Sequence, residues 1–150
     1  MVGKLAPYFA IGLLDAGFCA ALAAWWFAVP FRGSLATLFF VTALFLAVIL
    51  GIGYAISVGT RNQVGASQYA VLVTLLPTTM LSGFAFPIDQ MPATVRAISY
   101  LVYSRYYVTA LKDVFLKGSA LSGLKWPVAA MVVYAAVMMY VAARSFRKRL

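Results

Sequence analysis

The side chains that could perform acid–base or metal chemistry are scarce in this sequence. Its only carboxylates are Asp15, Asp89 and Asp113, its single cysteine is Cys19, and it contains neither histidine nor glutamate. This excludes histidine-based metal sites, Ser-His-Asp triads and glutamate general bases within the chain. A glycine-rich phosphate loop of the Walker type is also absent from the sequence. We therefore expect no enzymatic activity, no metal and no cofactor in this chain itself.

The composition is that of a protein whose solvent is lipid. Of the 150 residues, 65% are hydrophobic and 10% are charged, whereas a soluble domain has about 45–50% apolar and about 25% charged residues. The net charge of +9 could suggest nucleic acid, but the basic residues lie between apolar runs and at the C-terminus. Because they form no basic face with interleaved aromatic residues, we expect membrane topology, and no nucleic-acid partner, to explain the charge.

Four apolar stretches are long enough to cross about 30 Å of hydrocarbon as helices. They cover residues 5–29, 35–58, 66–86 and 126–143. Only the first stretch contains a charged residue, Asp15. The sequence therefore predicts an all-α, polytopic membrane protein with four transmembrane helices.

The first stretch has a second interpretation, as a cleaved signal peptide. Lys4 gives it a positive start, and Ala21-Leu22-Ala23 resembles a cleavage site. However, the apolar run continues past that site and Asp15 interrupts it, so we favour a retained helix.

Charge next to the last span predicts the orientation. The tail at residues 144–150 is strongly basic, and positive charge beside a span favours the cytoplasmic side. Four spans then place Arg32 and residues 87–125 outside. We expect a multi-pass protein of the inner (cytoplasmic) membrane with both termini in the cytoplasm.

Small residues recur at every fourth position in the first two spans. That spacing lets helix backbones approach closely in lipid, although alanine is also simply common in this chain. The residues concerned are Ala16, Ala20, Ala24 and Ala28 in the first span, and Ala47, Gly51 and Ala55 in the second.

Residues 87–125 separate the third and fourth spans without forming a polar loop. Residues 93–103 have apolar side chains at helical spacing, and Pro92 suits the first position of a helix. A second helical stretch runs to Lys117-Gly118, a typical C-terminal stop. Because each stretch is too short to span, we expect a re-entrant or interfacial helical hairpin before the last span.

The stretch LPTTMLSGFAFPIDQMP, at residues 76–92, resembles the signature of the ABC-2 type exporter permeases, particularly their bacterial drug-export branch. Further similarity at residues 3–8, 29–34, 105–108 and 111–118 extends the resemblance over essentially the whole chain. Two departures stand out: Tyr103-Ser104 lacks the proline that commonly precedes the family's Arg-Tyr pair, and the chain resembles only the last four of six family spans. The resemblance thus implies that residues 1–150 are the C-terminal portion of a permease transmembrane domain, truncated or split.

The resemblance also implies a function and partners. Such a chain is a transmembrane permease subunit of an ATP-driven exporter, and it forms the substrate path while a cytoplasmic ATP-binding subunit hydrolyses ATP. Two permease domains associate in the lipid, as a homodimer or heterodimer, and release an unidentified substrate outward. The residues alone leave a second class open, a non-transporting integral-membrane scaffold or assembly protein.

The signature region suggests a gate at the outer end of the third span. Pro77 has no N–H to donate, so we expect a kink there, and Ser82-Gly83 adds a second soft point before Pro87 ends the helix. The alternative is a static turn with the hairpin as a fixed lid. Asp15, near the middle of a span, is a candidate contact in the path or at the dimer seam, or a contact that only helps helices pack. The candidate path and gate residues are therefore Asp15, Pro77, Ser82, Gly83, Pro87 and Arg105.

Overall fold

The computed structural model describes residues 2–30, 32–60, 62–118 and 123–147, which form helices and the turns that join them, with no strand among them. Four helical segments are long and apolar enough to cross a membrane: Leu5–Trp25, Leu35–Gly59, Gln63–Leu81 and Lys125–Arg144. The predicted all-α fold with four candidate membrane spans is therefore confirmed.

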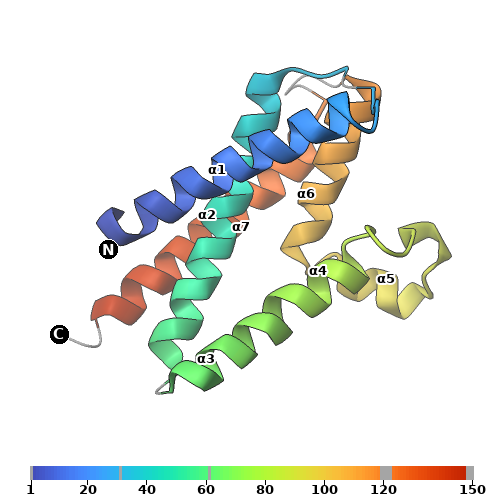
Figure 1. The fold of residues 1–150 in the computed structure, drawn as a ribbon. Coiled ribbons are helices and arrows are strands. Elements are labelled where there is room, and N and C mark those ends of the chain that lie inside the picture. The colour runs from blue at the N-terminus through green and yellow to red at the C-terminus, as the bar shows by residue number, and fades with distance from the viewer. Residues whose placement is uncertain (1, 31, 61, 119–122, 148–150) are drawn as a thin grey trace.

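Helices α2 (Leu35–Gly59) and α7 (Lys125–Arg147) form the centre of the molecule and pack along one another (Figure 1). A Cβ atom on Gly51 would lie 3.0 Å from the Cβ of Met138, a tight contact. The missing side chain thus lets the two backbones approach closely, as small residues do between membrane helices. This agrees with the prediction made from the small residues of the second span.

Helix α1 (Val2–Trp25) lies across α2 (Figure 1), and two of its glycines face side chains of α2. Gly12 faces Leu46, and Gly17 faces the ring of Phe39, whose Cζ would lie 3.1 Å from an added Cβ. Of the predicted alanine stripe, Ala20 packs against the core. The helix ends at Trp25, earlier than the predicted residue 29, and Ala28 beyond it has a positive φ of 51°, which does not continue a right-handed helix.

The third span is a continuous helical run with an irregular middle. It consists of α3 (Gln63–Ala70), a π-helical segment η1 (Val71–Leu75) and α4 (Leu76–Leu81). In a regular helix the ring of Pro77 would clash with the carbonyl of Val73. The wider π-helical turn lies directly before the proline and accommodates it without ending the helix.

The third span ends at Leu81, so the prediction that it continues to Phe86 and ends at Pro87 is wrong. Ser82 and Gly83 are accordingly the turn after the helix and not a soft point inside it. Gly83 has φ +80°, in the left-handed region, where glycine commonly terminates helices.

Two short helices follow this turn, as predicted. After the 3-10 turn η2 (Ile88–Gln90), α5 covers Ala93–Ser99 and α6 covers Tyr103–Lys112. The π-helical segment η3 (Asp113–Lys117) extends α6 to Gly118, whose φ of +63° makes it the predicted C-terminal stop. The break between α5 and α6 forms without a proline, because Val102 adopts an extended conformation.

The core lies where α2, α6 and α7 meet. One buried cluster contains Leu38, Val41, Ala110, Val114, Leu124 and Met131, and a second contains Val48, Ile52, Tyr103 and Ala135. By contrast, no residue in the most apolar windows of the first and third candidate spans is buried. The third span meets the rest of the molecule near its two ends, beside α2 at one and beside α5 and α6 at the other (Figure 1).

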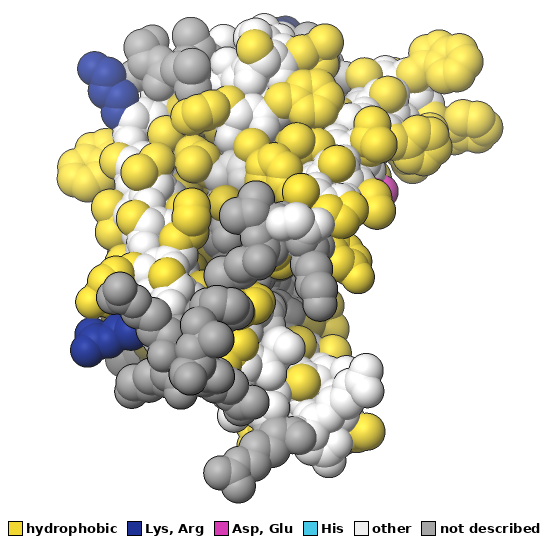
Figure 2. Space-filling view, turned by 90° about the vertical axis from the view of Figure 1, so that its left-hand side faces the viewer, with side chains coloured by type: hydrophobic (Ala, Val, Ile, Leu, Met, Phe, Trp, Pro, Cys, Tyr) yellow, Lys and Arg dark blue, Asp and Glu magenta, His cyan; other side chains and the backbone are white. Residues whose placement is uncertain are grey.

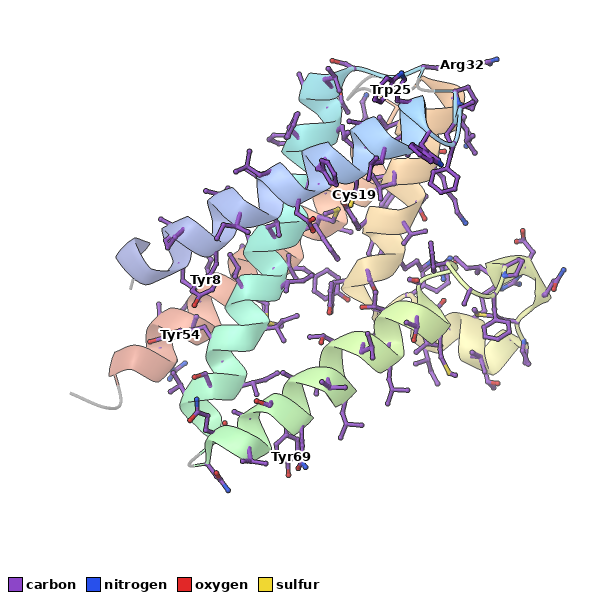
Figure 3. The ribbon with its side chains drawn as sticks, in the orientation of Figure 1. Tyr8, Cys19, Trp25, Arg32, Tyr54 and Tyr69 are labelled. Atoms are coloured by element: carbon purple, nitrogen blue, oxygen red, sulfur yellow. The ribbon has the colours of Figure 1, made fainter. Side chains whose placement is uncertain are left out.

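The connections lie at two opposite ends of the molecule. The backbone N–H of Arg32, between α1 and α2, donates to the carbonyl of Phe115 in the middle of η3 (3.2 Å). Trp25 and Arg32 lie at this end, whereas Tyr8, Tyr54 and Tyr69 lie toward the other (Figure 3). Figure 2 shows hydrophobic side chains gathered over the upper part of the visible face, with Lys and Arg at its upper left and lower left.

Candidate functional site

Five of the six predicted path and gate residues lie around the end of the third span and the hairpin. Asp15 is the exception, because it lies on the exposed side of α1, away from the other five. The structure therefore does not bring this carboxylate together with the candidate gate. Among the described residues, no group of His, Cys, Asp and Glu could hold a metal ion.

Pro77 lines a cavity of about 420 Å³ between the third span and the core. The other walls come from α2, from the turn between α5 and α6, and from α7. They include Ile52, Ile56, Leu101, Tyr103 and Met138. The cavity is thus bounded by elements from four separate parts of the chain, and its walls are apolar almost throughout.

Ser82 and Gly83 form the turn that follows the third span. The buried hydroxyl of Ser82 donates to the carbonyl of Thr78, one helical turn earlier, and accepts from the N–H of Phe84 (3.3 Å). A Cβ atom on Gly83 would lie 2.8 Å from the side chain of Ile88. Because the φ of Gly83 is also positive, replacing it with alanine would strain this turn and would not straighten the helix.

Pro87 is exposed and precedes the 3-10 turn η2. It lines a second cavity, of about 350 Å³, between the end of α4 and the start of α5, together with Met80, Phe86, Gln90 and Met91. Pro87 therefore shapes the segment that joins the third span to the hairpin.

Arg105 holds the turn between α5 and α6 together. Its guanidinium donates to the hydroxyl of Ser99 and to the carbonyl of Arg96 (3.4 Å), and it lies 3.8 Å from the ring centroid of Tyr100. Tyr106 adds a bond from its hydroxyl to the carbonyl of Tyr100 (2.9 Å). With these contacts Arg105 has the geometry of a clamp on the hairpin.

Two residues that sequence reasoning missed connect these elements to one another. Lys112, on α6, donates to the carbonyl of Gly83 (3.0 Å), and Tyr134, on α7, donates to the carbonyl of Leu101 (2.7 Å). Both bonds join positions far apart in the sequence, and no local sequence pattern predicts them. A lysine in an amphipathic helix and a tyrosine in a membrane span look ordinary by themselves.

An aromatic stack joins α6 to α2. The rings of Phe45 and Tyr107 are parallel with centroids 3.9 Å apart, and Phe45 also contacts Tyr103 at 6.0 Å. The hydroxyls of Tyr107 and Thr42 lie 3.3 Å apart within hydrogen-bonding distance. Stacked aromatic pairs of this kind add to the energy of burial, so α6 is anchored to α2 while α4 is not.

Comparison with known proteins assigns the family. The family model described as ABC-2 type transporter matches residues 1–116. The chain belongs to the ABC-2 type transporter family. The chain is also 47% identical over 116 residues to the probable multidrug ABC transporter permease YbhS of Escherichia coli, covering 77% of this chain and 31% of that protein.

More distant relatives agree with this assignment. The probable multidrug ABC transporter permease YbhR of Escherichia coli is 28% identical over 120 residues, covering 80% of this chain and 32% of that protein. The linearmycin resistance permease protein LnrN of Bacillus subtilis is 23% identical over 135 residues, covering 90% and 34% respectively. This ABC-2 chain therefore spans about a third of the length of these relatives. No solved structure matches it.

Proposed function

We propose that this chain is the membrane-spanning permease of an ATP-driven exporter, and that a cytoplasmic ATP-binding subunit hydrolyses the ATP. The observation that carries this proposal is the family match over residues 1–116 of a chain with four apolar, membrane-length helices. In this proposal the partner hydrolyses ATP, and this chain, which has no histidine and no glutamate, forms the substrate path. Nucleotide-driven closure of the partner subunits would move the spans and release substrate outward.

A second permease domain is the other proposed partner. The chain spans about a third of the length of its relatives, which is compatible with the proposal that its four spans form the C-terminal portion of a permease transmembrane domain. Large apolar side chains on the first and third spans are exposed, among them Leu14, Phe18 and Leu72. These faces are available to lipid and to the second domain, and Asp15 on the first span is a proposed polar contact there or in the substrate path.

The proposed orientation places both termini in the cytoplasm and the hairpin outside, in the inner membrane. The contact between Arg32 and Phe115 supports a common side for the first connection and the hairpin. Single cysteines at Ser34, Asn62 and Ser119, in a background without Cys19, test this with an impermeant thiol reagent; Ser119 lies outside the described residues. We expect labelling of the Ser34 and Ser119 variants from outside intact cells, and labelling of Asn62 would reverse the orientation.

The hairpin is proposed to be re-entrant. Its turn is bonded to Tyr134, and nine residues at 1.5 Å each put this tyrosine about 14 Å from the start of α7. That distance is close to half of a hydrocarbon layer of about 30 Å. The outer end of the third span is the proposed outward gate. The candidate gate residues around that end are Pro77, Ser82, Gly83, Pro87 and Arg105.

The partnership can be tested without knowing the substrate. A complete permease containing this chain should copurify with its ATP-binding subunit, and assembly should change the rate of ATP hydrolysis severalfold. Residues 1–150 alone should show no ATP hydrolysis and weak capture of that subunit. A complete permease that neither binds an ATP-binding subunit nor alters its activity would contradict the exporter assignment and favour a scaffold.

A further inference from the structure

The two arms of the hairpin are buried to very different degrees. The first arm is defined as residues 84–101 and the second arm as residues 103–118, and the structure describes every residue of both. In the first arm Ser99 alone is buried. In the second arm, by contrast, Ala110 and Val114 are fully buried in the core formed with α2 and α7. Segments with few buried contacts open locally more easily than segments of a core.

The second arm also packs main chain to main chain against the connection between α1 and α2. The N–H of Arg32 donates to the carbonyl of Phe115 (3.2 Å), one of the last four residues of η3, whose carbonyls lack partners within the helix. A Cβ atom on Gly33 would lie 2.5 Å from the carbonyl oxygen of Val114. A Cβ atom on Gly118 would lie 2.8 Å from the carbonyl oxygen of Arg32. Because these neighbours are backbone atoms, neither glycine can take a side chain unless the two segments separate.

The first arm is held near its two ends by side-chain hydrogen bonds. Lys112, on the second arm, donates to the carbonyl of Gly83, directly before the first arm. At the other end Tyr134, on α7, donates to the carbonyl of Leu101, and Arg105 clamps the turn. Breaking these bonds would release the first arm without opening the core. Moving the second arm would open both the core and the main-chain contact with the connection.

Resting on the proposed outward gate, we propose that the hairpin opens by its first arm alone, while the second arm and the connection between α1 and α2 form a fixed frame. The first arm turns about its two ends, at Gly83, whose φ is +80°, and at Val102, whose backbone is extended. The side-chain bonds at these ends hold it against the frame. Gly33 and Gly118 are positioning residues, because their missing side chains let the two parts of the frame pack together.

Tyr134→Phe tests whether the first arm opens alone. The change removes the hydroxyl that bonds to Leu101 and keeps the ring. In the 150-residue chain in lipid nanodiscs, the helical amides of α5 should exchange hydrogen about three- to tenfold faster, the value of one hydrogen bond. Those of α6 and η3 should keep the wild-type rate, whereas a hairpin that opened as one unit would show the same acceleration in both arms. Tyr140→Phe is the matched control, since its hydroxyl, also on α7, bonds to Arg144 and not to the hairpin.

Gly33→Ala tests the frame in the opposite sense. Its new Cβ meets the carbonyl of Val114, so the amides of residues 113–118 should exchange several-fold faster while those of α5 keep the wild-type rate. Gly59→Ala is the matched control, since nothing lies within 4 Å of its added Cβ. Equal acceleration of both arms in either test variant, or an unchanged α5 in Tyr134→Phe, would overturn the proposal. Tyr134→Phe decides the matter by itself if Gly33→Ala does not fold.

The outcome is separable from that of the proposed function. These measurements use neither ATP nor a partner subunit, so they judge the two arms even where coupling to ATP hydrolysis fails. In a complete permease bound to its ATP-binding subunit, a non-hydrolysable ATP analogue should change hydrogen exchange several-fold in the first arm and leave the second arm and residues 32–34 unchanged. A complete permease that couples to that subunit but changes both arms equally would keep the exporter and reject the fixed frame.

Discussion

The ammonium group of Lys112 donates a hydrogen bond to the carbonyl oxygen of Gly83 across 3.0 Å. Gly83 lies just past the third span, where helix-terminal carbonyls lack partners in the helix. Lys112 lies on α6, which is anchored to α2 by the stack of Phe45 and Tyr107. The bond therefore ties the loosely packed third span to the firmly packed part of the molecule.

Replacing Lys112 with methionine should loosen the turn at residues 82–92. Methionine keeps most of the side-chain length but removes the hydrogen-bond donor. Loss of a hydrogen bond from a partly exposed ammonium should raise the equilibrium constant for local opening of the turn about two- to tenfold. Amide hydrogen exchange followed by mass spectrometry should show faster exchange in that segment. Lys117→Met is the matched control, since Lys117 pairs with Asp113 at 2.6 Å and does not contact the turn. Equal exchange in both variants would exclude this role for Lys112.

Arg105→Lys should open the hairpin turn although it conserves the charge. Lysine cannot reproduce the planar fork that reaches Ser99 and the Arg96 carbonyl while stacking on Tyr100. We expect several-fold faster hydrogen exchange and earlier proteolysis at residues 99–102. Arg96→Lys controls for charge, because only the backbone carbonyl of Arg96 takes part in this clamp. A turn as protected in Arg105→Lys as in Arg96→Lys would show that the clamp contributes nothing.

The spans were predictable from sequence because hydropathy is a local property. The C-terminal stop at Gly118 was predictable because a glycine at the end of a helical stretch is also a local signal. The end of the third span was not. Apolar residues continue through Phe86, but a left-handed Gly83 and the bond from Ser82 to the Thr78 carbonyl end the helix earlier.

Long-range contacts explain what else the sequence did not reveal about the site. Gly83 and Lys112 are 29 positions apart, and Leu101 and Tyr134 are 33 apart. Both pairs form only because α6 and α7 pack in their observed positions. No short sequence pattern predicts that packing. Pro77, Gly83 and Arg105 were proposed as candidates because proline, glycine and arginine are conspicuous in an apolar run, and their role in a gate stays a prediction.

Gly51→Ala should destabilise the packing of α2 against α7. The new Cβ would lie 3.0 Å from the Cβ of Met138, so the helices must separate slightly, and overpacking of this kind costs about 1–3 kcal/mol. Gly53→Ala is the matched control, since nothing lies within 4 Å of its added Cβ. Thermal unfolding in detergent should show a lower midpoint temperature for Gly51→Ala than for the wild type, and no such decrease for Gly53→Ala. If the two variants melted alike, α2 and α7 would not be in close contact at Gly51.

Pro77→Ala tests whether the irregular third span serves the gate. Alanine restores the N–H that proline lacks and is favoured in a helix interior by about 3 kcal/mol, so the π-helical segment η1 should tighten into regular α-helix. A complete permease with this change, reconstituted with its ATP-binding subunit, should insert normally but show several-fold slower ATP-driven efflux of a neutral fluorescent lipophile such as Nile red. Gly83→Ala is left out of the test because it would strain the turn beside Ile88.

Pro7→Ala is the control for Pro77→Ala, because Pro7 also lies inside a helix, α1, but far from the proposed gate. Its efflux should match the wild type. If Pro77→Ala exported Nile red at the wild-type rate while hydrogen exchange showed that η1 had become regular helix, flexibility at Pro77 would have no part in transport. The proline would then only shape a static turn, with the hairpin as a fixed lid over the outer end of the third span.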